Sequence, residues 1–191
     1  HTRQQFGGPI ERLPAVAELV TDMKIALEAA RALTYETSRI CDLENNNLRI
    51  LETVADLPKE EQKERKQLSR TLKRVNGMLT PMSKYYASEM CVRVANDAIQ
   101  VLGGSGYMKD YAAERYLRDA RITTIYEGTS QLQIVAAVRG VASGSFESFV
   151  ADFENKVYGD QELDALKNQL IEARKRVQEV IQFVKSQPTA Y

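Results

Sequence analysis

A chain of 191 residues with 26 basic and 26 acidic side chains has no net charge, so it lacks the electrostatic attraction that draws proteins to nucleic acid or to an anionic membrane. Cys41 and Cys91 cannot build a disulfide framework, and no apolar run approaches the roughly 18 residues that a membrane span needs. These features predict a soluble, cytoplasmic protein. The chain opens at His1 without an initiator Met, so we expect it to be a piece of a longer protein.

The first predicted helix follows Pro14. Apolar residues recur there at steps of three and four, which indicates an amphipathic helix that runs to about Cys41. We expect the run ENNN at 44–47 to interrupt this helix, because asparagine is a poor helix former.

A second helical region begins near Asp56 and Pro58, where two glutamates follow the proline as they often do at a helix N-terminus. The polar stretch that comes next predicts a solvated helix face. Pro81 should restart or kink the helix, and an apolar stripe then continues to the glycine-rich run at 103–106, which is expected to end it.

The remaining helices are predicted to be shorter, except for the last. We expect one over 112–119 and another from about Thr129 to Val141, with a boundary at ASGSF, 142–146. Asp160 could cap a final helix that runs to about Val184.

These helices predict an all-α fold. No run shows sustained strand alternation, and long amphipathic helices joined by short turns pack as an antiparallel bundle. We assign residues 1–142 to the bundle and 143–191 to a helical extension. The apolar face of the extension is expected to dock on its own bundle or on a second copy of the chain.

Some catalytic and binding arrangements are not expected. One terminal histidine and two distant cysteines do not match the ligand spacing of a zinc site, and a serine hydrolase would depend on His1. The run LGGSGYMKD lacks the third glycine of a dinucleotide fingerprint, so taken alone it indicates the end of a helix. Its two adjacent glycines would still allow a bulky ligand to approach the backbone, one turn after Gln100.

Glu127, in the stretch TIYEGTSQ, has two interpretations. In the first, the following Gly-Thr-Ser run starts a helix and the carboxylate complements the positive end of that helix. In the second, Ile125 and Tyr126 create an apolar setting, in which a carboxylate is hard to ionise and suited to accept a proton. Spacing alone does not decide between them.

The segment AIQVLGGSGYMKDYAAERYLRDARITTIYEGTSQLQ resembles the last part of the acyl-CoA dehydrogenase family. The resemblance also includes RQQFGGP near the start, is loose through the middle and is tight from about Lys84 to Gly140. The joint order of Q-x-x-G-G, R-D-A-R-I and I-Y-E-G-T-S-Q is specific, although no single piece is. The resemblance implies a helical domain, a β domain and a C-terminal four-helix bundle, of which this chain looks like the bundle with an extension.

The same resemblance implies a function and a base. Family members use FAD to oxidise an acyl-CoA thioester to the 2-enoyl-CoA, and they pass the electrons to an electron-transferring flavoprotein. Glu127 matches the base that removes the α-proton, and its backbone N–H would donate to the thioester carbonyl. Tyr126 and Gly128 would line the substrate path. Without the β domain, the isolated chain is expected to be inactive.

The resemblance also implies cofactor contacts. Thr129 and Gln131 match positions that contact FAD. Other positions match segments that reach the FAD of a neighbouring subunit, which implies a homo-oligomer; these are Arg3, Gln5, Phe6, Gln100, Gly103 and Gly104.

Three departures bear on the subclass. Pro14 stands where many members carry glutamine, and both the long connection around 56–75 and the segment after Gly140 point to the larger bacterial-type or very-long-chain members. The alternatives are an acyl-CoA oxidase, a related flavoprotein that binds DNA, and a helical interaction module without activity. The zero net charge speaks against DNA.

Overall fold

The computed structural model describes residues 3–187 and is almost entirely helical, which confirms the all-α class. The outer ends of the two expected regions, residues 1–2 and 188–191, lie outside the described residues. Two unpredicted strands, β1 (Gln4–Gln5) and β2 (Gly8–Pro9), pair antiparallel before the short helix η1 (Ile10–Arg12). The α-helices are α1 (Pro14–Thr53), α2 (Lys59–Leu102), α3 (Gly104–Tyr107), α4 (Ala113–Ile122), α5 (Ser130–Ala142), α6 (Ser145–Asn155) and α7 (Gln161–Ser186).

The chain divides into two compact units, one up to Ala137 and one from Val138 onward. The domain border expected at residue 143 stays a prediction.

In the part of the chain that the structure describes, no single helix is long and apolar enough to cross a membrane; only α5 taken together with α6 reaches the required length and apolarity.

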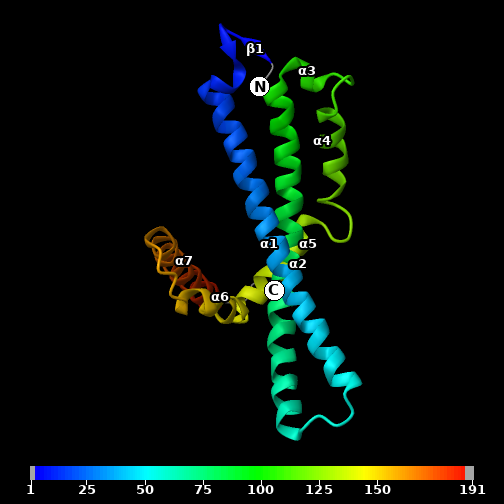
Figure 1. The fold of residues 1–191 in the computed structure, drawn as a ribbon, viewed down its shortest axis with the longest axis vertical. Helices are drawn as coiled ribbons and strands as arrows, with labels where there is room; N and C mark the ends of the chain where they lie inside the picture. Colours follow the sequence, from blue (N-terminus) through cyan, green and yellow to red (C-terminus); the bar gives the residue numbers. More distant parts are fainter. Residues whose placement is uncertain (1–2, 188–191) are drawn as a thin grey trace. The chain divides into compact units, whose positions relative to one another are not determined.

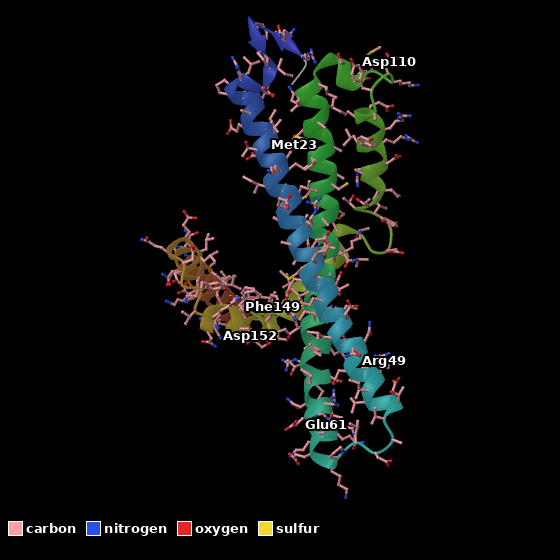
Figure 2. All side chains as sticks on the ribbon, viewed as in Figure 1. Met23, Arg49, Glu61, Asp110, Phe149 and Asp152 are labelled. Atoms are coloured by element: carbon pink, nitrogen blue, oxygen red, sulfur yellow. The ribbon has the colours of Figure 1, made fainter. Side chains whose placement is uncertain are left out.

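The first unit is built on an antiparallel pair formed by α1 and α2, with α4 packed against α2 (Figure 1). Arg49 and Glu61 lie toward the end where the two long helices are joined, and Met23 and Asp110 lie toward the opposite end (Figure 2). The buried positions of α1 and α2 are mostly apolar, and Met78 and Leu79 of α2 are fully buried. Burial of this apolar stripe supplies the main driving force for the pair.

The expected helix break at 44–47 is wrong, because α1 continues through these residues to Thr53. The reason is tertiary. Asn47 is only 3% exposed, and its amide nitrogen donates to the Arg65 carbonyl at 2.9 Å and to the Ser69 hydroxyl at 2.7 Å. Its amide oxygen accepts from the Arg65 guanidinium at 3.2 Å. Hydrogen bonds to α2 therefore outweigh the weak helix propensity of asparagine.

We predict that Asn47→Ala lowers the free energy of unfolding of the 191-residue chain by about 1–3 kcal/mol, because it removes the hydrogen bonds of a buried amide to half-buried partners on α2. Urea unfolding followed by circular dichroism measures this. Asn45→Ala is the matched control, since Asn45 is exposed on the same helix. Equal stability of the two variants would mean that the hydrogen bonds of Asn47 to α2 do not stabilise this part of α1.

The helix does not restart at Pro81, because α2 is one helix from Lys59 to Leu102 with Pro81 inside it, and the alternative of a kink there stays a prediction. The proline removes one backbone donor from the helix. It is buried between core positions on the same helix, so tertiary packing offsets the local cost. The end of the helix at the glycine run is confirmed, since the cap residue is Gly103.

The second unit contains α6 and α7. Asp160 caps α7 as predicted, and its carboxylate accepts from the N–H groups of Glu162 and Leu163 at 2.9 and 3.0 Å. Helix α6 was not predicted, because only a boundary was expected over part of its sequence. The Glu154 carboxylate of α6 accepts from Arg174 of α7 at 2.5 Å, and this hydrogen bond raises the pKa of the guanidinium above its usual value.

Candidate active site

Glu127 lies in a turn, residues 123–130, that joins α4 to α5. Its backbone has a φ of +51°, and the next residue, Gly128, has a φ of +96°. A positive φ is uncommon for a residue with a side chain and carries conformational strain. The N–H of Ser130 donates to the Thr124 carbonyl at 3.1 Å and closes the turn around both residues.

Two side chains of α2 hold this turn. The Lys84 ammonium donates to the Thr123 carbonyl at 2.6 Å and to the Gly128 carbonyl at 2.9 Å. The Ser130 hydroxyl donates to the Glu89 carboxylate. Sequence reasoning did not single out Lys84 or Glu89 for a role. A reader of the sequence could have found them as charged residues that lie among the apolar positions of α2.

The side chain of Glu127 is exposed and forms no hydrogen bond or ion pair among the described residues. Its backbone N–H also has no acceptor within that part of the chain, whereas its carbonyl accepts from the Gln133 amide at 3.1 Å. The carboxylate is therefore not bonded to the start of α5, as a capping group would be. The apolar setting expected from Ile125 and Tyr126 is not formed by the described residues, because these side chains are 46% and 49% exposed.

Gly128 suits this turn for a steric reason. Its positive φ is a conformation that side chains rarely adopt. A Cβ atom at this position would also lie 2.6 Å from the Gln133 amide nitrogen. A larger residue would therefore disturb both the turn and the bond that Gln133 makes to the Glu127 carbonyl.

The two candidate flavin contacts next to Glu127 lie together. Thr129 and Gln131 line a pocket of about 340 Å³, with Arg121 and Ser130 among their neighbours. Glu127 and Tyr126 do not line this pocket. The hydroxyl, amide and guanidinium groups here are hydrogen-bonding groups that suit a polar ligand.

The other candidate cofactor residues gather at the far end of α4. The Arg3 guanidinium donates to the Leu102 carbonyl, and it lies 3.9 Å from the position of a Cβ on Gly103. The Gly103 N–H donates to the Gln100 carbonyl at 3.1 Å. Gly104 is exposed and has open space where a side chain would be, so the backbone there is accessible to a ligand.

Gln5 and Phe6 lie at the tip of the β1–β2 hairpin, and Phe6 is 86% exposed with a φ of +54°. Among the glycines at 103–106, Gly106 is the one most closely packed against other residues. A Cβ on Gly106 would meet the Ile99 carbonyl oxygen at 2.7 Å, so this position admits no side chain.

The predicted residues thus form two groups, at opposite ends of α4. That helix has 10 residues and rises about 15 Å. Guanidinium and amide donors in the group at Arg3 fit a pyrophosphate, and the free carboxylate at Glu127 fits proton transfer. Residues 3–187 contain no group of three or more His, Cys, Asp or Glu side chains that could hold a metal ion.

Comparison with known proteins identifies the class of this domain. Residues 1–142 match the family model described as acyl-CoA dehydrogenase, C-terminal domain. The chain therefore belongs to the acyl-CoA dehydrogenase family, as the resemblance predicted.

Individual relatives are similar over the same region. The chain is 37% identical over 131 residues to the caffeyl-CoA reductase-Etf complex subunit CarC of Acetobacterium woodii and to the acyl-CoA dehydrogenase of Bacillus subtilis, covering 69% of this chain and 27% of each relative. It is equally similar to the mitochondrial short-chain specific acyl-CoA dehydrogenase of Bos taurus, 25% of which is covered. The chain thus spans about a quarter of the length of these relatives.

A solved structure shares the fold. It is described as the electron transferring flavoprotein of Acidaminococcus fermentans, studied toward a mechanism of flavin-based electron bifurcation. The likeness has a TM-score of 0.52 at 32% sequence identity, and it covers 73% of this chain and 29% of that chain.

Proposed function

We propose that this chain supplies the catalytic base of an FAD-dependent acyl-CoA dehydrogenase, with Glu127 removing the α-proton of an acyl-CoA thioester. The proposal rests on the availability of the Glu127 carboxylate. Its carboxylate has no partner among the described residues, and it lies on a braced turn within the family-matched region. A carboxylate engaged in capping or ion pairing would be less available as a base.

The backbone at Glu127 supports a second role in the same step. Its N–H has no acceptor among the described residues, so it can donate to the thioester carbonyl and stabilise the negative charge that develops there. Gly128 keeps bulk away from the base, and Tyr126, about half exposed, is available to line the substrate path. The surroundings that exclude water from the carboxylate would come from other domains of the complete enzyme.

FAD, when bound, would accept the hydride from the β-carbon of the substrate. Thr129 and Gln131 would contact the cofactor beside Glu127. The residues at the other end of α4 would contact the FAD of a neighbouring subunit through the Arg3 guanidinium, the amides of Gln5 and Gln100, the Phe6 ring and the open backbone at Gly103 and Gly104. This arrangement requires a homo-oligomer.

We infer that the electrons pass to an electron-transferring flavoprotein. One relative is named as a subunit of a caffeyl-CoA reductase-Etf complex, and the structural neighbour is described as an electron transferring flavoprotein. We place the complete enzyme in the cytoplasm, since both cysteines of the chain are free, as is usual in a reducing compartment.

The complete enzyme tests this function. Under anaerobic conditions, acyl-CoA thioesters of different chain length should bleach its flavin band, and a dye acceptor should restore the oxidised spectrum. Production of hydrogen peroxide in air at the same rate would identify an oxidase instead. Absence of flavin reduction by every thioester would refute the proposal.

A further inference from the structure

The turn that carries Glu127 needs an external support. Two successive residues, Glu127 and Gly128, have positive φ values of +51° and +96°. Strained backbone of this kind persists only where surrounding contacts hold it in place. Within the turn itself, the bond between Ser130 and Thr124 closes the ends but does not reach the two strained residues.

Lys84 reaches the strained part of the turn from a different element. Its ammonium lies between the Thr123 and Gly128 carbonyls, at 2.6 and 2.9 Å. The same nitrogen lies 5.5 Å from the centre of the Tyr126 ring, within cation–π range. One side chain thus contacts the residue before Glu127 and the residue after it.

The charge of Lys84 has no competing use in the described chain. No carboxylate forms an ion pair with it there, and the nearby Glu89 accepts from Ser130 instead. An ammonium has three donors and no acceptor, and its bonds to carbonyl oxygens are strengthened by its charge. Lys84 is half-buried on α2, a long helix whose core residues are packed, so its anchor is rigid.

We propose that Lys84 is a positioning residue for Glu127, because its ammonium clamps the backbone on both sides of the carboxylate. This inference rests on the function proposed above. Lys84 need not touch substrate or cofactor. It sets the direction of the carboxylate and of the backbone N–H at Glu127, on which proton removal and charge stabilisation both depend.

The test compares three variants of the complete enzyme. Lys84→Met removes the ammonium while keeping a similar length, and Lys84→Arg keeps a charged donor. Lys73→Met is the matched control, since Lys73 is an exposed lysine on the same helix. Hydrogen–deuterium exchange of the 123–131 peptide reports the clamp without reference to activity, and anaerobic mixing with acyl-CoA reports flavin reduction.

We expect Lys84→Met to speed exchange of the Ser130 amide about tenfold and to slow flavin reduction by about 10- to 100-fold, with KM changed much less. Lys84→Arg should recover part of both, and Lys73→Met should match the unmodified enzyme. Unchanged exchange in Lys84→Met, or faster exchange with normal flavin reduction, overturns the proposal for Lys84 alone. An unmodified enzyme that no acyl-CoA reduces refutes the proposed function, and the positioning role falls with it.

Discussion

Replacing Glu127 with glutamine should lower the rate of flavin reduction in the complete enzyme by about 10²- to 10⁴-fold. Glutamine keeps the shape of the side chain and the backbone N–H but cannot accept the α-proton. Since this interaction acts in the transition state, kcat should fall far more than KM rises. Anaerobic single-turnover mixing, followed at the flavin band, measures the rate directly.

Two comparisons make this result specific. Glu127→Asp should retain part of the activity, because it withdraws the carboxylate by one methylene without removing it. If Glu127 only complemented the start of α5, Glu127→Gln would cost at most about 1 kcal/mol of stability and little rate. Flavin reduction at near the unmodified speed in Glu127→Gln would therefore place the base elsewhere.

Replacing Met78 with alanine should lower the free energy of unfolding of the chain by about 2–5 kcal/mol. Met78, on α2, is fully buried at 0% exposure. The substitution removes apolar contacts and leaves a cavity that a pair of packed helices can only partly refill. Urea unfolding followed by circular dichroism should show an earlier midpoint with a similar slope.

Met108→Ala is the matched control for this prediction, because Met108 is 54% exposed just after α3. The same chemical change there should alter stability by less than about 0.5 kcal/mol. A similar loss of unfolding free energy in both variants would mean that burial of Met78 does not account for its contribution to stability.

Local sequence was sufficient for most helices. Apolar spacing of three and four residues predicted α1, the part of α2 after Pro81, and α7, since this periodicity follows from helix geometry alone. Asp160 was predicted as a cap because the interaction involves neighbouring residues. The motif around Glu127 predicted the family, which the match over residues 1–142 confirms.

Contacts between distant residues decided the rest. Asn47 stays helical because partners on α2 satisfy its amide, and Pro81 stays inside α2 because the core packs around it. Lys84 supports the Glu127 turn through the Thr123 and Gly128 carbonyls, which lie 39 and 44 positions further along the chain. Local propensity contains no term for such long-range hydrogen bonds and buried packing, so only the tertiary structure shows which strained or weakly helical segments are held in place.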